Sequence, residues 1–256
     1  MKISVITATY NCADTVATAF KAFSDQQYGA KEHVVIDGAS RDGTLDVLNA
    51  HRQQIAVLVS EPDKGIYDAL NKGIARCSGD VIGFLHGDDL YADQRVLARV
   101  AEAFKDDSVD AVYGDLDYVR REDASRIVRH WKSGVFSARK LAWGWMPPHP
   151  TLFVRREVYQ RLGGFDLRFR IAADYDWMLR LLSQPDVRVV YIPEVLVKMR
   201  VGGMSNRSLK ALIRKSSEDY RIMRKNGVGG AHTLVWKNLS KLPQFLRRSK
   251  PQNVSR

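Results

Sequence analysis

The sequence is short of cysteine and of long apolar runs, and each shortage narrows the class of protein. Two cysteines, Cys12 and Cys77, among 256 residues do not make the disulfide framework of a secreted domain. The first residues lack the apolar stretch of a signal peptide. No window approaches the roughly 18 uninterrupted apolar residues that a membrane-spanning helix needs. These absences predict a cytoplasmic protein whose contact with a membrane, if it has one, is peripheral.

Acidic residues are scarce in one part of the chain only. Residues 207–256 carry 13 Lys or Arg and two acidic residues, Glu218 and Asp219, whereas the rest of the chain has equal numbers of both signs. The net charge of +11 therefore lies in this segment. Such a tail favours an anionic partner, either a phospholipid surface or nucleic acid, although a solvated cationic face has the same composition. Because no zinc-finger or RNA-binding signature accompanies it, no nucleic acid is expected.

Short β-rich runs alternate with amphipathic segments through the first half of the chain. Residues 15–24, between the first two runs, have helical spacing. The alternation predicts an α/β fold with a Rossmann-like, mainly parallel sheet flanked by helices. The predicted strands are residues 3–7, 33–36, 55–60, 81–85 and 111–113.

The second half of the chain has a looser pattern. We predict two strands within 118–131, a connection over 134–145, helices over 154–162, 173–182 and 209–225, and a strand over 187–192. The last of these helices is amphipathic, with its apolar side formed by Leu209, Leu212, Ile213, Tyr220 and Met223. A further apolar stripe consists of Val235, Leu239, Leu242 and Leu246. The expected organisation is a catalytic domain over 1–206, with a nucleotide-binding half 1–114 and an acceptor half 115–206, and a basic helical tail over 207–256.

The stretch 80–89 is the most informative part of the sequence. Its apolar run breaks at Gly87 and delivers two adjacent carboxylates, Asp88 and Asp89. Carboxylates beyond the end of a strand most often hold a divalent cation that neutralises phosphate oxygens. The alternative role is to cap a helix predicted around 94–104.

Three more polar clusters fall where strands of the predicted sheet end. Residues 7–11 offer hydroxyls and amides, and residues 60–74 are polar and punctuated by glycine. In residues 35–44, Asp37 emerges at a strand end, where a single carboxylate suits a ribose or base contact. Four such clusters at one edge of a sheet predict a nucleotide site.

Together these phrases resemble the family 2 glycosyltransferases, whose GT-A fold binds a nucleotide-sugar through a metal-assisted Asp motif. The resemblance covers roughly residues 1–205 and is most specific in 35–44, 60–74 and 85–89. Phrases such as 148–153 and 201–205 are similar to those of bacterial enzymes that build capsule, exopolysaccharide and O-antigen units.

The resemblance implies a metal-dependent transfer from a UDP- or GDP-linked sugar, with inversion at the anomeric carbon. Asp89 is implied as the ligand of Mn or Mg, with Asp88 as a second ligand or a contact to the donor. Asp174 maps onto the general base. His86, Leu70 and Ala173 depart from the family pattern, which has Asp, Arg and Glu at these positions. The expected nucleotide-sugar contacts are Thr9, Tyr10, Asn11, Asp37, Asp63, Gly65, Lys72, Asp88 and Arg200.

The acceptor side is less visible in the sequence. His149 lies between two prolines that fix its backbone, and it either faces the leaving group or acceptor or is a structural residue. Asp176 and Trp177 are further candidates, and Arg200 belongs either to a segment that closes over the diphosphate or to an ordinary loop. The resemblance implies a polyprenyl-diphosphate-linked glycan acceptor at the inner face of the bacterial plasma membrane. The basic tail would then bind that anionic surface.

Three alternative functions start from other features of the sequence. A nucleotidyltransferase also joins a nucleotide pocket to an Asp-bound metal, but its Gly-rich signature near the first strand is missing. A catalytically silent nucleotide-sugar binder is motivated by His86 and Ala173. A nucleic-acid-binding protein is motivated by the basic tail.

Overall fold

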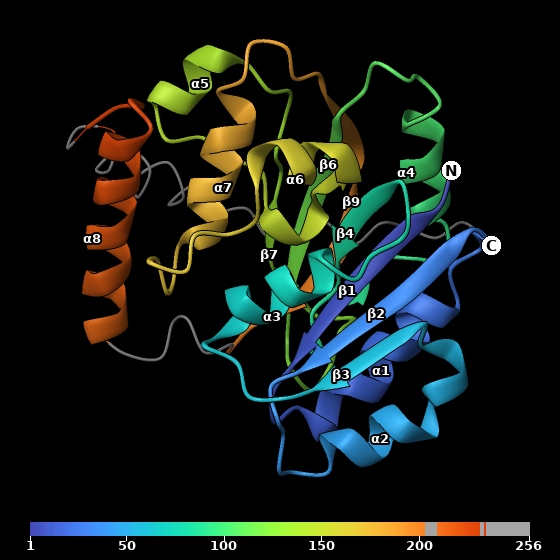
Figure 1. The fold of residues 1–256 in the computed structure, drawn as a ribbon. Helices are drawn as coiled ribbons and strands as arrows, with labels where there is room; N and C mark the ends of the chain where they lie inside the picture. The colour runs from blue at the N-terminus through green and yellow to red at the C-terminus, as the bar shows by residue number, and fades with distance from the viewer. Residues whose placement is uncertain (203–208, 231–232, 234–256) are drawn as a thin grey trace.

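A single mixed sheet runs through the molecule in the computed structural model, which describes residues 1–202, 209–230 and 233 (Figure 1). Its strand order is β3-β2-β1-β4-β8-β6-β9-β5, and β7 pairs with β6 outside that path. The strands are β1 Ile3–Thr9, β2 Lys31–Asp37, β3 Val57–Ser60, β4 Val81–Phe84, β5 Leu90–Tyr91, β6 Ala111–Val119, β7 Ile127–Trp131, β8 Phe153–Arg155 and β9 Val189–Arg200.

The first half of the sheet is parallel, as predicted. β1 pairs in parallel with both β2 and β4, and β2 pairs in parallel with β3. Both faces of these strands are covered, so every residue of β4 and all but one of β1 are buried. The carboxyl ends of the four strands therefore meet at one edge of the sheet.

The second half is mixed, but most strands of the whole sheet run in one direction, so the prediction of a mainly parallel sheet is confirmed. β8 runs antiparallel to both β4 and β6, whereas β9 is parallel to β6. Because β8 reverses the direction twice, β6 and β9 run the same way as β4. Their carboxyl ends therefore point to the same edge as those of the parallel half.

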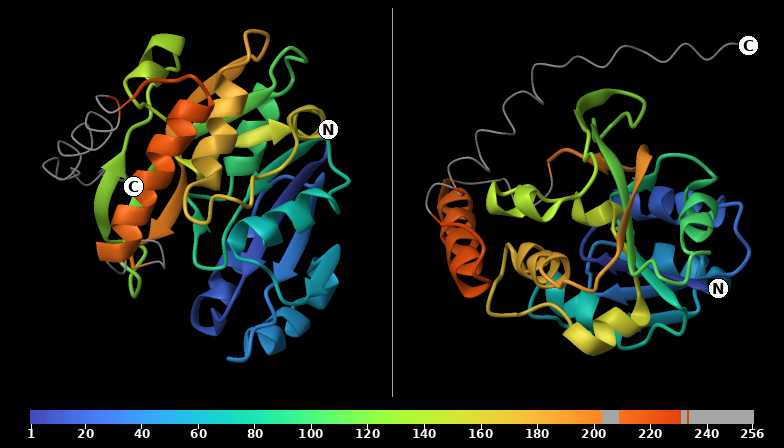
Figure 2. Two further views of the ribbon diagram at one scale, coloured as in Figure 1. Left: turned by 60° about the vertical axis from the view of Figure 1, so that its left-hand side comes forward. Right: turned by 90° about the horizontal axis from the view of Figure 1, so that it is seen from above.

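Helices cover both faces of the sheet (Figure 2). One core joins the sheet to α3, α6 and α7, and two smaller cores lie under α1 and α4 on the other face. α8 packs against α7 on the side away from the sheet in both figures. The helices are α1 Ala13–Ser24, α2 Thr44–Ala50, η1 Arg52–Gln54, α3 Ile66–Ile74, α4 Val96–Ala103, α5 Ala138–Ala142, η2 His149–Thr151, α6 Arg156–Leu162, α7 Ala173–Leu182 and α8 Leu209–Lys225.

Several predicted elements need correction. The expected helix over 154–162 begins as the strand β8 and becomes α6 only at Arg156. A three-residue buried strand cannot be distinguished from a helix by its apolar pattern. The strand predicted over 187–192 continues to Arg200, and 118–131 contains the end of β6 and then β7.

α8 is also not the simple amphipathic helix that its pattern suggested. Tyr220, assigned to its apolar side, is 42% exposed, whereas Glu218 and Asp219 are buried beside Ile222 and Met223. The apolar stripe predicted over 235–246 lies outside the described residues. In the part of the chain that the structure describes, no helix is long and apolar enough to cross a membrane.

Candidate functional site

Asp37 ties three strand ends together at the carboxyl edge of the sheet. Its fully buried oxygens accept hydrogen bonds from the hydroxyls of Thr9, Ser40 and Ser60, at 2.9, 2.5 and 2.8 Å, and from the Ser40 amide at 2.9 Å. Four donors match the roughly four acceptor positions of a carboxylate. Asp37 and Thr9 therefore form the floor of the site by fixing the loops that carry its exposed groups.

The rim of the site brings three loops into contact. A Cβ atom at Gly38 would lie 2.5 Å from Asp63 Oδ2 and 3.2 Å from the ring of Tyr10, so any larger residue there must displace Asp63. Asp63 also accepts the Gly65 amide at 2.8 Å, and Gly65 has a φ of 116° that other residues rarely adopt. Tyr10 is 56% exposed. An exposed aromatic face beside a carboxylate suits a nucleotide base.

Two non-glycine residues with positive φ lie in the same loops. Asn11 has a φ of 46° and Ala39 a φ of 60°. Asn11 is held by its own amide, which donates to Ser40 Oγ at 2.9 Å, and by its side-chain oxygen, which accepts the Arg41 amide at 2.9 Å. A non-glycine residue keeps such a strained backbone conformation only when the surrounding structure holds it there. These conformations are common at ligand sites.

The two adjacent carboxylates after β4 occupy different environments. Asp89 is 1% exposed, and neither of its oxygens has a hydrogen-bond partner among the described residues. Burial raises its pKa well above the usual range, and the charge of Asp88 adds to the effect. Asp88 is half-buried and acts electrostatically on Cys12 and His86. By exposure, Asp88 rather than Asp89 is the better placed of the two to meet a ligand.

Arg200 fixes the backbone of this turn. It ends β9 at 8% exposure and donates from Nη1 to the Asp88 carbonyl at 2.7 Å. Its other nitrogens donate to the Arg121 carbonyl and the Thr18 hydroxyl, both at 3.1 Å. The guanidinium is thus part of the scaffold, and because Arg200 is the last residue of a strand it belongs neither to a closing segment nor to an ordinary loop. Residues 203–205 of that segment lie outside the described residues.

Two histidine rings interact electrostatically with the carboxylate of Asp174. His149, 7% exposed in η2, stacks on Phe84 at 5.0 Å and lies 6.5 Å from the ring of His86. Burial lowers the pKa of His149 to about 4, although Asp174 opposes the shift. Burial also lowers the pKa of His86, opposed by Asp88 and by Asp174. Both rings are therefore neutral near pH 7, and His86 lies within electrostatic reach of both carboxylates.

Asp174, the second residue of α7, is half-buried and oriented by neighbouring donors. Its Oδ1 lies 2.9 Å from the hydroxyl of Tyr67 and accepts the Tyr175 amide at 2.8 Å. The same hydroxyl lies 2.8 Å from the carbonyl of Ile171. Burial, together with Asp174, raises the pKa of Tyr67 well above its usual range, so the hydroxyl keeps its proton. Oδ2 has no hydrogen bond from the described residues and is the oxygen available to a ligand.

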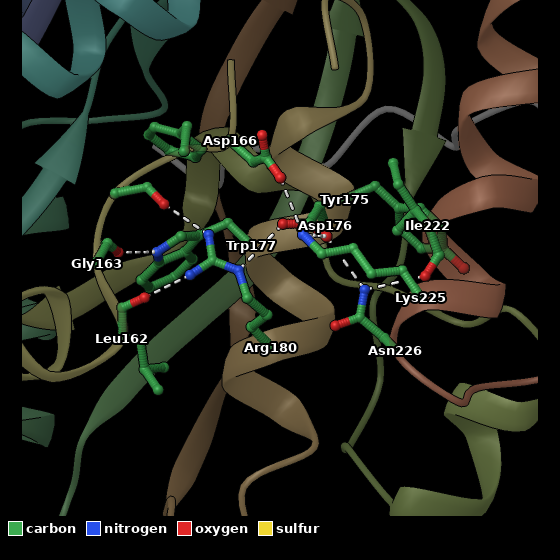
Figure 3. Close-up of polar contacts among 12 residues, drawn as sticks. Leu162, Gly163, Asp166, Tyr175, Asp176, Trp177, Arg180, Ile222, Lys225 and Asn226 are labelled. Carbon is green, nitrogen blue, oxygen red and sulfur yellow. Dashed lines mark hydrogen bonds and ion pairs between the residues drawn. The ribbon is translucent and has the colours of Figure 1, made fainter. Parts of the chain in front are cut away.

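Asp176 and Trp177 do not reach the site, contrary to the prediction that they lie on the acceptor side. Both side chains are fully buried. Asp176 binds Arg180 and Lys225, each at 3.0 Å (Figure 3). Trp177 donates to the Gly163 carbonyl at 2.8 Å and stacks on a neighbouring tyrosine ring. One turn of helix turns these neighbours of Asp174 into the core and toward α8.

Lys72 lies at the rim but is already paired. Its ammonium is 2.9 Å from Glu61 and 3.6 Å from Asp68, and it donates to the Pro62 carbonyl at 3.0 Å. The hydrogen bond to Glu61 raises its pKa. The ammonium thus braces the turn between β3 and α3, and a phosphate would have to compete with two carboxylates for it.

The candidate site also contains two residues, Tyr67 and Glu218, that no sequence motif predicts as site residues. Tyr67 stands inside the phrase 60–74, which could have drawn attention to it. Glu218 binds the loop before α7, as described below, across a sequence separation of 46–48 residues. No local pattern signals a pairing of that range.

The described residues contain no group of three or more His, Cys, Asp or Glu side chains arranged to hold a cation. The available donors are the carboxylates of Asp88 and Asp89. Mg²⁺ is commonly bound by one or two carboxylates together with substrate phosphates. The hard oxygen donors and the two unpaired buried oxygens of Asp89 fit a divalent cation that a diphosphate helps to hold.

The fold is similar to that of solved glycosyltransferases. The mannosyltransferase PcManGT from Pyrobaculum calidifontis, solved with GDP-Man and Mn²⁺, has a TM-score of 0.66 at 22% identity over 98% of this chain and 76% of its own. S. aureus TarS 1-349, solved with UDP-GlcNAc, has a TM-score of 0.69 at 18% identity over 89% of this chain and 66% of its own. The chain thus has the GT-A fold.

Residues 4–163 match the model of glycosyl transferase family 2, and the chain belongs to that family. An uncharacterized glycosyltransferase of Mycobacterium tuberculosis is 37% identical over 195 residues, which are 72% of this chain and 70% of the relative. A PGL/p-HBAD biosynthesis glycosyltransferase of the same species is 31% identical over 208 residues, 79% of this chain and 78% of the relative. The protein is a glycosyltransferase.

Proposed function

We propose that this glycosyltransferase moves a sugar from a UDP- or GDP-linked donor to a hydroxyl of an acceptor glycan, with inversion and with Mn or Mg. The observation that carries the proposal is that the carboxylates of Asp88 and Asp174 both oppose the lowered pKa of the His86 ring. One of these carboxylates comes from the donor half and the other from the acceptor half, and both act electrostatically on the same ring. Transfer needs help at the departing diphosphate and at the attacking hydroxyl, and the two carboxylates supply one each.

The donor nucleotide is assigned to the rim formed by Tyr10, Gly38 and Asp63. The base lies against the exposed face of Tyr10, with Asp63 as a hydrogen-bond acceptor. Thr9, Asp37, Asn11 and Gly65 hold these loops in place through the contacts described above. That PcManGT is solved with GDP-Man and TarS with UDP-GlcNAc supports a nucleoside diphosphate sugar as the ligand.

The cation is assigned to Asp88, with Asp89 as the second ligand if its carboxyl is deprotonated. When bound, Mn or Mg neutralises the charge that develops on the leaving diphosphate. Arg200 keeps the Asp88 carbonyl, and hence the whole turn, in a fixed position. The neutral rings of His86 and His149 line the space beyond Asp88 without adding positive charge that would compete for the phosphates.

Asp174 is assigned as the general base. Its open oxygen Oδ2 takes the proton from the acceptor hydroxyl as that hydroxyl attacks the anomeric carbon from the face opposite the leaving group. Tyr67 and the Tyr175 amide hold Oδ1 and thereby set the direction of the carboxylate. A single displacement of this kind inverts the anomeric centre.

The acceptor is assigned as a lipid-linked glycan, in particular one on a polyprenyl diphosphate. The basic composition of residues 207–256 supports an encounter with an anionic membrane surface at the cytoplasmic face. One relative is named for PGL/p-HBAD biosynthesis, and a cell-surface product for this chain is consistent with that name.

Calorimetric titration with a panel of UDP- and GDP-sugars, with and without Mn, tests the donor and cation assignments. We expect one donor to bind at least tenfold more tightly with Mn, and Asp88→Asn to remove the gain. If no nucleotide-sugar binds under either condition, the proposed function is wrong. If a donor binds but is never transferred or hydrolysed, the chain is a silent nucleotide-sugar binder.

A further inference from the structure

Glu218 of α8 reaches across to the loop that carries Asp174. Its carboxylate is 5% exposed and accepts three consecutive backbone amides, from Arg170 at 3.2 Å, Ile171 at 2.9 Å and Ala172 at 3.1 Å. Arg214, one turn earlier in α8, lies 3.5 Å from the same carboxylate. The bonds end two residues before Asp174, at the N-cap position of α7.

The position of these bonds explains why a buried charge is tolerated. The N-terminus of a helix exposes unpaired amides and a positive dipole end, and a carboxylate placed there is stabilised by both. α7 has Ala172 at its N-cap and no side-chain cap of its own. Glu218 therefore satisfies the amide of the N-cap residue Ala172 and the two amides before it, ahead of the first turn of α7.

The same loop is held from the opposite side by Tyr67. Its hydroxyl is shared between the carbonyl of Ile171 and Oδ1 of Asp174. The backbone of Ile171 is thus held at both polar groups, because its N–H is bound to Glu218 and its carbonyl lies next to the Tyr67 hydroxyl. These contacts leave the first turn of α7 little freedom to rotate, and Asp174 lies in that turn.

α8 is anchored to α7 independently of Glu218. Near its carboxyl end, Lys225 lies 3.0 Å from both Asp166 and Asp176, and the side-chain amide of Asn226 donates to Asp176 at 3.1 Å (Figure 3). Arg180 binds the other oxygen of Asp176 at 3.0 Å. Because this second set of contacts keeps α8 docked, a change at Glu218 can be read as local.

We propose that Glu218 is a positioning residue for the reaction: by holding the amides of residues 170–172 it keeps the carboxylate of Asp174 at the acceptor hydroxyl. The inference rests on the proposed function, in which Asp174 is the base. A base must lie within hydrogen-bond reach of the proton that it takes. A displacement of about 1 Å costs about 100-fold in rate. The donor site lies on other loops, so Glu218 acts on transfer and not on donor binding.

The test compares Glu218→Gln and Glu218→Ala with Glu32→Gln in the full chain. Glu32 is a matched control, since it is a buried carboxylate that accepts the amides of Ser78 and Gly79 at 2.6 and 3.1 Å, away from the site. For each variant, thermal unfolding gives the folded fraction, titration gives the donor Kd, and steady-state transfer gives kcat and the acceptor KM.

We expect kcat to fall about tenfold in Glu218→Gln, which keeps one acceptor oxygen, and about 100-fold in Glu218→Ala. The donor Kd stays within twofold of the wild type in both. Glu32→Gln lowers the melting temperature but keeps kcat per folded molecule. The graded loss of kcat at constant donor affinity is the result that a merely structural role would not give.

Two results would overturn the inference. One is a folded Glu218→Ala with wild-type kcat, and the other is an equal loss of kcat in Glu218→Ala and Glu32→Gln. Asp174→Asn, measured alongside, distinguishes a failure of the positioning role of Glu218 from a failure of Asp174 as the base. If it abolishes transfer while Glu218→Ala does not, only the positioning role is lost. If Asp174→Asn transfers normally, Asp174 is not the base, and both the proposed function and this inference fail.

Discussion

One oxygen of Asp174 is committed to the protein and the other is open. Tyr67 and the Tyr175 amide hold Oδ1, and the described residues leave Oδ2 without a hydrogen bond. A base with one oriented oxygen can present the other in a fixed direction. In contrast, both oxygens of Asp37 accept hydrogen bonds from the protein, four in all, so its carboxylate holds the loops in place.

Removing the Tyr67 hydroxyl tests the orientation of the base. A hydrogen bond to a charged group contributes about 1.5–3 kcal/mol, so we expect Tyr67→Phe to lower kcat about tenfold to 100-fold. The donor Kd stays unchanged, as titration would show. Tyr159→Phe is the matched control, since the Tyr159 hydroxyl is buried with no hydrogen-bond partner among the described residues. Equal rates for the two variants would remove Tyr67 from the site.

Adding one methyl group at Gly38 tests the donor rim. A Cβ atom there collides with Asp63, whereas a Cβ at Gly29 meets nothing within 4 Å. Gly38→Ala should therefore displace Asp63 and weaken donor binding about tenfold, which corresponds to about 1.4 kcal/mol. Gly29→Ala should bind the donor like the wild type. A Gly38→Ala protein with unchanged donor Kd would place the nucleotide elsewhere.

Among the helices, α8 packs against the one that carries Asp174, and we propose that it belongs to the catalytic domain rather than to the tail. The expected boundary at residue 206 cuts off a helix whose Glu218 and Lys225 bind the loop and helix that carry Asp174. The composition of 207–256 concealed this, because its two acidic residues are the ones that point inward. A boundary after Thr233, whose hydroxyl donates to the Ala142 carbonyl at 2.9 Å, keeps these contacts.

Two truncations separate the parts of the C-terminal segment. A chain that ends at residue 206 should lose several degrees of melting temperature and most of its transfer activity, because the first turn of α7 loses its partner. A chain that ends at residue 233 should keep fold and transfer to a water-soluble acceptor but bind anionic vesicles more weakly, as co-sedimentation would show. If both chains bind vesicles like the full chain, the tail has no part in membrane contact.

Sequence periodicity predicted the parallel strands and α7 but not the short strand β8 or the pairing of distant strands. The parallel strands and α7 were found because short β-rich runs and helical spacing are local signals. β8 was missed, since three residues carry too little pattern, and the long β6–β9 pairing depends on residues some 80 positions apart. In the site, Tyr10 is exposed and Asp63 and Asp174 are half-buried, and their roles as donor contacts and as the base stay predictions. Asp176 and Trp177 are fully buried, and the spacing of Asp174 and Asp176 already indicates that only one of these two carboxylates faces the cleft.

At the scale of the molecule, the two halves of the sheet meet at one edge. The parallel half ends in the loops of Tyr10, Asp37 and Asp63, and β9 of the mixed half ends at Arg200. Arg200 joins the halves by binding both the Asp88 carbonyl and the Thr18 hydroxyl. Donor and acceptor groups therefore rest on one continuous scaffold.

That scaffold encloses a histidine whose burial makes stability depend on pH. His33 is 1% exposed beneath α1, and burial, together with Lys31, lowers its pKa to about 3. In the unfolded chain its pKa is about 6.5. The folded form thus disfavours the proton, and the stabilisation present above pH 6.5 is lost progressively as the pH falls toward 3.

Urea unfolding between pH 7 and pH 5 measures this dependence. We expect the free energy of unfolding attributable to His33 to fall by about 1.4 kcal/mol per pH unit below pH 6. His33→Gln should have a correspondingly shallower slope. A variant slope equal to that of the wild type would mean that His33 binds a proton equally well in the folded and unfolded chains.

The most direct test of the central claim is transfer by Asp174→Asn with the donor that the panel identifies. Asparagine keeps the size and the hydrogen bond to Tyr67 but cannot accept a proton as a base. The account predicts that this variant binds the donor with wild-type affinity in the presence of Mn and that its kcat for transfer falls at least 100-fold. Wild-type kcat in a folded Asp174→Asn would contradict the account, because the acceptor hydroxyl would then lose its proton to another group.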